Sequence, residues 1–441
     1  MTFTPDVLLA ELARHEAQAG RPARYVVAFS GGPDSTALLI ALAETRTRHG
    51  RDLLGVHVNH RLHPDADRWA SHCADVSRSL RIDYRCETVR VEAGAGPEAA
   101  ARDARYAALE RHVHVGDWLL TAHHREDQAE TLLLQLLRGG GMAGIAGMRA
   151  CRAFAHGYLV RPLLDIARHE LVEFVDAQKI ACIDDPSNAE SRFDRNYLRN
   201  EVLPLIERRW PHARARLARS AALAREAVEL LDALADDDIR NLGDNASRLD
   251  LVAFRQLPRS RQKNLLRRAV QRAALPPVPA PQLARIIDEV AHARDDAGPR
   301  VTWAGAEARR FRDALYLQHE LPPCRFEARE LGHDGVDLGP GMGRLTLERG
   351  AATGLADAVV AAGLTLRRRR GGEEIRPAGQ RHTRKLKKLL HEAGVLPWWR
   401  DRVPLVYSGD RLVAVADLWL AAEASEPGGS ALVWRDRPPI A

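Results

Sequence analysis

The sequence has few of the features that mark membrane, secreted or metal-cluster proteins. Its longest uninterrupted apolar run is Ala37–Ala43, far below the roughly 18 residues that a spanning helix needs. The N-terminal segment has no basic stretch followed by an apolar one, so it does not resemble a secretion signal. Five scattered cysteines without a C-x-x-C pair favour a reducing compartment and argue against a structural zinc or iron–sulfur site. We therefore expect a cytoplasmic protein.

Lysine is also scarce: the chain has 5 Lys against 60 Arg, and no lysine follows a glycine. A Walker-type P-loop needs Gly-Lys followed by Ser or Thr, so this phosphate cradle is excluded. Three lysines lie in Leu364–Leu390, where seven Arg and three Lys against two Glu give a net charge of +8, compared with +6 for the whole chain. A solvated helix face is the simpler interpretation of such an isolated charge run, and a surface for a polyanionic partner such as nucleic acid is the alternative.

The length of 441 residues, at about 150 residues per domain, predicts more than one domain. In the N-terminal half, short apolar runs such as Tyr25–Phe29 and Leu53–His60 alternate with helix-like segments. This alternation predicts a parallel α/β sheet covered on both faces, with ligands at the carboxyl ends of the strands. We predict an α/β domain over 1–215, a mainly helical connector over 216–330 and a small basic α/β domain over 340–441, with one helix at Lys385–Ala393.

A glycine-rich motif, SGGPDS, joins the first predicted strand to a helix. Its residues are Ser30, Gly31, Gly32, Pro33, Asp34 and Ser35. Backbone N–H groups and the positive end of the helix would converge here on an anion such as phosphate, and Pro33 suits the first helical turn. Because Asp34 is out of place in an anion pocket, we expect a Mg²⁺ ion between its carboxylate and a polyphosphate. A literal G-x-G-x-x-G at Gly139–Gly144 follows a helix and is interpreted as a loop.

The SGGPDS motif resembles the PP-loop of the N-type ATP pyrophosphatases, and further motifs in the same order resemble the tRNA(Ile)-lysidine synthetase family. These motifs are HVNH (His57–His60), DAD (Asp65–Asp67), ARDARY (Ala101–Tyr106), TAHHREDQAET (Thr121–Thr131), LLQLLRGGGMAGIAGM (Leu133–Met148), RPLL (Arg161–Leu164), DDPSN (Asp184–Asn188), RNYLR (Arg195–Arg199), GGEEIRPAG (Gly371–Gly379) and RKLKKLLHEAGVLPWWRD (Arg384–Asp401). The resemblance spans nearly the whole chain and implies a PP-loop (HUP-like) fold for the N-terminal domain.

The resemblance also implies a reaction. The O2 atom of the wobble cytidine of tRNA(Ile) with a CAU anticodon attacks the α-phosphate of ATP, pyrophosphate leaves, and the amine of free lysine displaces AMP to give lysidine. ATP and Mg²⁺ are the implied cofactors, with Asp34 as the metal ligand. Arg102 and Arg105, three apart on one helix, are our candidates for stabilising the phosphate charge. An exposed pairing with Glu98 or Asp103 is the alternative, and a homodimer is left open.

Free lysine has a side-chain pKa near ~10.4, so its ammonium must be bound and then lose a proton. Asp127 and Glu130, three apart in the first turn of one helix, are our candidates for this, with His123 beside them. Helix capping by Asp127 and a core position for His123 are the alternatives. Because the positive helix end lowers carboxylate pKa values, we expect capture of the ammonium rather than proton abstraction.

Other expectations follow from the resemblance alone. Asp185, Ser187, Asn188 and Asn196 match a polar segment near the substrate cleft. The predicted tRNA-binding residues are Arg195, Arg199, Arg384, Lys385, Lys387 and Lys388. The chain departs from the family pattern at Glu126, where an aspartate is usual, and at Arg61 and His63 in the loop after the second strand.

Three other functions compete with this interpretation. A PP-loop synthetase for small molecules would need no +8 segment, and an RNA thiolase would need paired cysteines, which the sequence lacks. A non-catalytic RNA-binding protein would have no reason to keep SGGPDS, Asp127 and Glu130 together.

Overall fold

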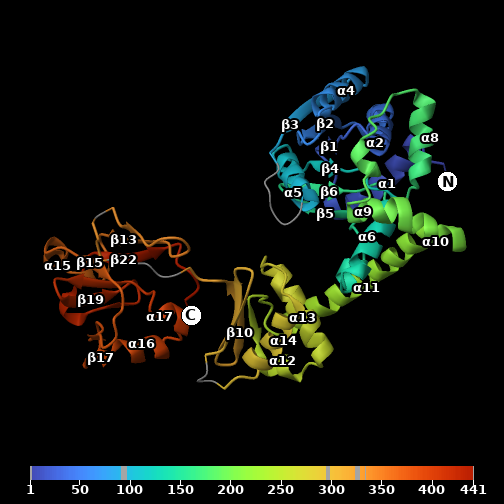
Figure 1. Ribbon diagram of the computed structural model, residues 1–441. Coiled ribbons are helices and arrows are strands. Elements are labelled where there is room, and N and C mark those ends of the chain that lie inside the picture. Colours follow the sequence, from blue (N-terminus) through green and yellow to red (C-terminus); the bar gives the residue numbers. More distant parts are fainter. Residues whose placement is uncertain (1, 91–96, 295–297, 323–327, 333, 441) are drawn as a thin grey trace. The chain divides into compact units, whose positions relative to one another are not determined.

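The computed structural model describes residues 2–90, 97–294, 298–322, 328–332 and 334–440, without the side chains of 97–99 (Figure 1). Its contacts form two compact units, Met1–Asp232 and Ala233–Ala441, which we describe separately. The predicted division into three domains stays a prediction. Within the described ranges, no helix is both long and apolar enough to cross a membrane.

The first unit is built on a six-stranded sheet with the order β3-β2-β1-β4-β6-β5. Its strands are β1 (Arg24–Ala28), β2 (Asp52–Asn59), β3 (Asp83–Thr88), β4 (Trp118–Leu120), β5 (Cys151–Phe154) and β6 (Gly157–Val160). All neighbouring strands are parallel except β5, which forms a hairpin with β6. The predicted parallel α/β sheet is therefore confirmed, and the carboxyl ends of β1, β2 and β4 meet at one edge.

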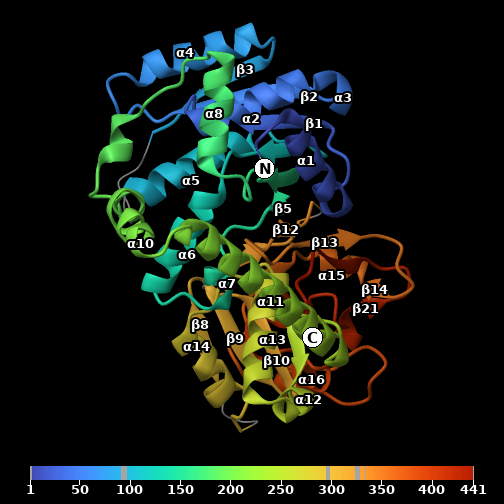
Figure 2. The ribbon, with the colours of Figure 1, turned by 90° about the vertical axis from the view of Figure 1, so that its right-hand side faces the viewer.

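Helices cover both faces of this sheet (Figures 1 and 2). The helices of the first unit are α1 (Pro5–Ala19), α2 (Pro33–Glu44), α3 (Arg46–His49), α4 (Ala66–Ser79), α5 (Pro97–Glu110), α6 (Arg125–Leu137), α7 (Met142–Ile145), α8 (Arg168–Gln178), α9 (Asp194–Tyr197), α10 (Leu203–Arg209) and α11 (Ala213–Asn241), whose last residues belong to the second unit. One core contains apolar residues of α1, α2, α4 and α8, and the core on the opposite face contains Leu109 of α5. The predicted glycine loop at Gly139–Gly144 includes the short helix α7.

The first part of the second unit combines helices with an antiparallel sheet of order β7-β10-β9-β8. Its elements are β7 (Arg248–Asp250), α12 (Leu251–Gln256), α13 (Arg259–Arg272), α14 (Ala280–Arg285), β8 (Arg300–Trp303), β9 (Ala306–Phe311) and β10 (Ala314–His319). Helix and sheet residues, among them Phe254, Leu266 and Leu315, share one buried core. The predicted helical content is present, and the β-like stretch ALYLQ (Ala314–Gln318) of the sequence lies in β10.

The last part of the chain consists mainly of short strands in a five-stranded, a three-stranded and two two-stranded sheets. Its elements are β11 (Arg329–Glu330), β12 (Val336–Asp337), β13 (Arg344–Glu348), β14 (Gly354–Leu355), α15 (Asp357–Ala361), β15 (Thr365–Arg367), β16 (Glu374–Ile375), β17 (Arg384–Lys385), α16 (Leu386–Glu392), α17 (Pro397–Arg400), β18 (Leu405–Ser408), β19 (Arg411–Val415), β20 (Trp419–Leu420), β21 (Ser425–Glu426) and β22 (Ala431–Arg435). The predicted helix is present as α16, but Lys385 precedes it and pairs with Glu374 in a two-residue ladder.

Candidate active site

The SGGPDS motif lies between β1 and α2 and is held in shape by its own hydroxyl groups. Ser35 Oγ and Thr36 Oγ1 donate hydrogen bonds to the Gly32 carbonyl at 3.1 and 2.9 Å, and the Ser30 amide donates to Ser35 Oγ at 3.3 Å. Pro33 occupies the first turn of α2, where its missing N–H costs nothing. The loop therefore presents the positive end of a buried helix to any anion at the sheet edge.

A cavity of about 650 Å³ opens beside this loop at the carboxyl ends of β1, β2 and β4. Residues of the motif line it together with the loop after β2, part of α5 and the start of α6. A later polar segment that includes Asp185 and Ser187 also contributes to its wall. The structure thus brings the SGGPDS motif and the predicted substrate residues Asp127 and His123 into one cavity.

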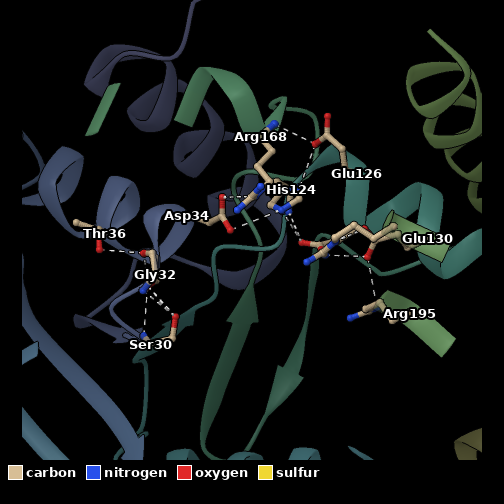
Figure 3. A network of polar contacts seen from close by, with 12 residues as sticks. Ser30, Gly32, Asp34, Thr36, His124, Glu126, Glu130, Arg168 and Arg195 are labelled. Atoms are coloured by element: carbon tan, nitrogen blue, oxygen red, sulfur yellow. Dashed lines mark hydrogen bonds and ion pairs between the residues drawn. The ribbon is translucent and has the colours of Figure 1, made fainter. Parts of the chain in front are cut away.

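Asp34 has a carboxylate that is available for a cation. Its Oδ1 atom is buried and accepts no hydrogen bond from the described residues. The nearest cations are only at ion-pair distance, His124 Nε2 at 3.7 Å from Oδ2 and Arg168 Nε at 3.6 Å from Oδ1 (Figure 3). Burial raises the pKa of Asp34, against the lowering effect of these two cations. A single carboxylate beside a phosphate-binding loop fits Mg²⁺, which usually takes its other ligands from phosphates and water.

The described residues contain no group of three or more His, Cys, Asp or Glu side chains that could hold a metal ion by themselves.

His124 connects Asp34 to the carboxylates of α6, and sequence reasoning did not single it out. Its side chain is 2% exposed, with Nδ1 3.0 Å from Glu126 Oε2 and Nε2 3.4 Å from Asp127 Oδ2 (Figure 3). Burial lowers the pKa of His124, but the carboxylates of Asp127, Glu126 and Asp34 outweigh burial and raise it. His124 is therefore a buried imidazole between the phosphate-binding loop and α6, and the carboxylates around it favour its protonated form.

The predicted lysine-binding carboxylates lie together on α6 and are paired with arginines. The Glu130 side chain is fully buried and accepts hydrogen bonds from Arg199 Nε at 2.6 Å and Nη2 at 2.9 Å. Arg199 Nη2 also donates to Asp127 Oδ1 at 3.1 Å, and Arg195 Nε lies 3.5 Å from Glu130 Oε2. Arg195 and Arg199, which the sequence assigned to tRNA, thus have carboxylate partners in this structure, and their contact with tRNA stays a prediction.

The pKa values of His123 and Asp127 both lie well below their ordinary range. Burial lowers the pKa of the His123 imidazole to about 3. Burial opposes the ionised form of Asp127, but the neighbouring His124 and His123 and the hydrogen bond from the His124 amide lower the pKa of Asp127 to about 2. Asp127 therefore caps α6, as the alternative interpretation held, and it also lines the cavity as a carboxylate.

The two predicted phosphate-binding arginines differ in position. Arg105 lines the cavity, whereas the guanidinium of Arg102 lies over the ring of Tyr106, 5.7 Å from its centroid. The side chain of Glu98, one of the alternative partners, lies outside the described residues. The structure thus brings Arg105, but not Arg102, to the cavity wall.

The chain matches the family models described as "PP-loop domain" over residues 9–206, "TilS substrate binding domain" over 249–316 and "TilS substrate C-terminal domain" over 364–434. It is 40% identical to tRNA(Ile)-lysidine synthase of Alkalilimnicola ehrlichii, with 100% of this chain and 99% of the relative covered. The chain belongs to the tRNA(Ile)-lysidine synthase family. The enzyme of the same name from Coxiella burnetii is 38% identical over 98% of this chain and 96% of the relative.

Positions where this chain departs from the usual tRNA(Ile)-lysidine synthase pattern have defined structural roles. Glu126 contacts His124 and accepts a hydrogen bond from the amide of Arg168 at 2.9 Å. Arg61 adopts a left-handed backbone conformation, φ 51°, with its amide bound to the Asn59 side chain at 2.8 Å. The ring of His63 stacks on Trp69 with centroids 4.7 Å apart.

The matched C-terminal domain of this family member carries the predicted basic residues. Lys387 and Lys388 are exposed in the first turn of α16, and Lys385 is exposed just before it. Arg384 differs from them because its Nη2 donates to both carboxylate oxygens of Glu392, at 2.6 and 2.7 Å. The helix predicted at Lys385–Ala393 therefore does not include Lys385, because Arg384 and Lys385 form the strand β17.

Proposed function

We propose that this chain ligates free lysine to C2 of the wobble cytidine of tRNA(Ile) with a CAU anticodon, through an adenylated tRNA and with release of pyrophosphate and AMP. The observation that carries the proposal is the meeting of a phosphate-binding loop and a buried acidic pair at the ends of neighbouring strands, β1 and β4. Adenylation by ATP and capture of a cationic amine need these two environments within one substrate's length of each other.

At the ATP end, the SGGPDS loop binds the phosphates through the start of α2. Asp34 would hold Mg²⁺, which would supply positive charge against the polyphosphate. Arg105 lies on the cavity wall and adds a guanidinium to the same end. These groups stabilise the negative charge that develops on the pyrophosphate as it leaves.

At the lysine end, Asp127 and Glu130 provide the charge that recognises the ammonium group. Glu130 is already paired with Arg199, so an ammonium that reaches it must replace or share this guanidinium. This exchange leaves the net charge at Glu130 unchanged, because the lysine ammonium replaces the Arg199 guanidinium as its cationic partner. We therefore assign the acidic pair to capture of lysine and name no general base.

The RNA end of the proposal rests on the second unit. Lys385, Lys387 and Lys388 point a compact positive charge into solvent, and compact ammonium groups pair well with phosphates of an RNA backbone. The relatives' names support a tRNA(Ile) substrate, and the +8 segment gives the physical means to hold one.

The proposal is tested by mixing the protein with ATP, lysine and a tRNA(Ile) transcript that has a CAU anticodon. Pyrophosphate release and a mass increase of the wobble nucleoside that equals lysine minus water are expected. A transcript with uridine at the wobble position serves as the matched control. Pyrophosphate release without lysine incorporation would instead favour another PP-loop enzyme, such as a tRNA thiolase or a small-molecule adenylating synthetase.

A further inference from the structure

Arg168 lies beside the phosphate-binding loop, and neither ATP binding nor lysine capture as proposed above uses its guanidinium. It is the first residue of α8, and its side chain is 46% exposed. Its Nε atom lies 3.6 Å from Asp34 Oδ1, which is too long for a good hydrogen bond. A half-exposed ion pair at this distance is worth little, so Arg168 can leave Asp34 for a stronger partner at small cost.

The position of Arg168 is set by Glu126. Glu126 Oε2 accepts a hydrogen bond from the backbone amide of Arg168 at 2.9 Å and lies 3.0 Å from Nδ1 of His124. Figure 3 shows Arg168 and His124 between Glu126 and Asp34. Glu126 Oε2 on α6 thus contacts both the start of α8 and His124, the second cation near Asp34.

A guanidinium at this position suits the reaction proposed for the loop. Cleavage between the α- and β-phosphates transfers negative charge to the leaving pyrophosphate, and a guanidinium pairs with two phosphate oxygens at once. The side chain of Arg168 starts from the same sheet edge as the loop amides, and its present neighbour, Asp34, is itself part of the loop. With Asp34 serving as a ligand for Mg²⁺, the Arg168 guanidinium would be free to pair with phosphate oxygens.

We propose that Arg168 binds the β- and γ-phosphates of ATP, the part that leaves as pyrophosphate, and that Glu126 is the positioning residue that holds Arg168 at the loop. This inference rests on the proposed function for the identity of the nucleotide. It adds a phosphate ligand from α8 to the loop residues and Arg105.

The first test measures the binding of pyrophosphate to the full-length protein by calorimetry in the presence of Mg²⁺. Loss of one charge-assisted interaction is worth about 1.5–3 kcal/mol, so Arg168→Ala should weaken binding about ten- to a hundred-fold. Arg168→Lys should fall between the parent and Arg168→Ala, because it keeps the charge and loses the planar fork. Lys179→Ala, which removes a cation at the other end of α8, is the matched control and should bind like the parent.

The second test asks whether Glu126 acts through Arg168. Glu126→Gln should weaken pyrophosphate binding, and the double variant Glu126→Gln/Arg168→Ala should bind no more weakly than Arg168→Ala alone. Circular dichroism checks the fold of each variant. If Glu126→Gln does not fold, Glu126→Asp, which keeps the charge and shortens the side chain, replaces it. Additive losses would overturn the positioning role, since Glu126 would then act through another group such as His124.

Equal pyrophosphate affinity in the parent and in Arg168→Ala, or no binding by the parent, would overturn the role of Arg168. Because these measurements contain no tRNA and no lysine, they are independent of the RNA product. A protein that forms no lysidine but loses pyrophosphate affinity in Arg168→Ala would refute the proposed function and support this inference.

Discussion

The carboxylate of Glu130 is fully buried and receives two hydrogen bonds from the guanidinium of Arg199, at 2.6 and 2.9 Å. Burial raises the pKa of Glu130, whereas the bonds from Arg199 oppose that rise and favour the ionised form. Arg199 is thus the cation that favours the ionised form of Glu130 in the proposed lysine site.

Glu130→Gln should raise the KM for lysine much more than the KM for ATP. The variant loses one charge-assisted hydrogen bond, worth about 1.5–3 kcal/mol, so we expect a rise of about ten- to a hundred-fold. Steady-state kinetics with each substrate varied in turn measure both constants. Glu201→Gln removes an exposed charge two residues after Arg199 and should leave both unchanged. An unchanged KM for lysine combined with a raised KM for ATP would assign Glu130 to the nucleotide instead.

Asp34→Ala should abolish lysine-dependent formation of AMP and leave tRNA affinity within a few-fold of the parent. The reason is that Asp34 serves the ATP end of the cavity, while the exposed lysines of α16 serve the RNA. AMP release and filter binding of labelled tRNA measure the two properties separately. Turnover close to that of the parent at moderate Mg²⁺ would remove Asp34 from the mechanism.

The stability of the protein should fall as the pH decreases from about 6.5 toward 4, in part because of His123. Burial lowers the pKa of His123 to about 3, so in this range the unfolded chain binds a proton that the folded chain does not. The contribution of His123 to the free energy of unfolding is therefore present above pH 6.5 and decreases by at most about 1.4 kcal/mol per pH unit below it. His60, with a pKa of about 4, acts in the same direction.

Urea unfolding of the parent and of His123→Asn at several pH values tests this. The variant should show a shallower loss of stability with acid, whereas His169→Asn, an exposed position on α8, should follow the parent. Identical slopes for parent and His123→Asn would show that the pKa of His123 is the same in the folded and unfolded chains.

The triple substitution of Lys385, Lys387 and Lys388 by Ala should reduce the salt dependence of tRNA affinity. Each phosphate contact contributes very roughly 0.7–0.9 to the slope of log affinity against log salt, so the slope should decrease by about two to three. Discrimination between tRNAs should change much less, since phosphate contacts carry no base information. Arg384→Ala is a useful comparison because its guanidinium is paired with Glu392. Parallel lines for parent and triple variant would show that these lysines are only a solvated surface.

The sequence was sufficient to predict the parallel sheet and the position of the phosphate-binding loop. Buried runs such as Tyr25–Phe29 alternate with long helical segments, and this pattern has few structural interpretations. It did not predict three strands of the β7–β10 sheet. Those strands are short, and residues such as Ala306, Glu307 and Ala308 have no pronounced preference for strands; pairing with neighbours decides their structure.

The site was predictable only in part, because some of its contacts join residues that are far apart in the sequence. Asp127, Glu130 and His123 lie close together in the sequence, so one helical turn reveals their proximity. The partners of Glu130 and Asp34 come from residues 65 or more positions away, Arg195, Arg199 and Arg168, and only the folded chain shows which arginine faces which carboxylate. His124 was missed because its role depends on three carboxylates around it rather than on a motif of its own.

The contact between Gly31 and Ile183 limits which substitutions the protein can accept. The Ile183 amide donates to the Gly31 carbonyl at 2.9 Å, and a Cβ atom added to Gly31 would lie 2.3 Å from Ile183 Cδ1. With φ at +81°, Gly31 also occupies a conformation that other residues adopt at a cost. The phosphate-binding loop and the segment that leads to Asp185 are therefore structurally coupled. An insertion, deletion or enlargement in either one would be viable only with a compensating change in the other.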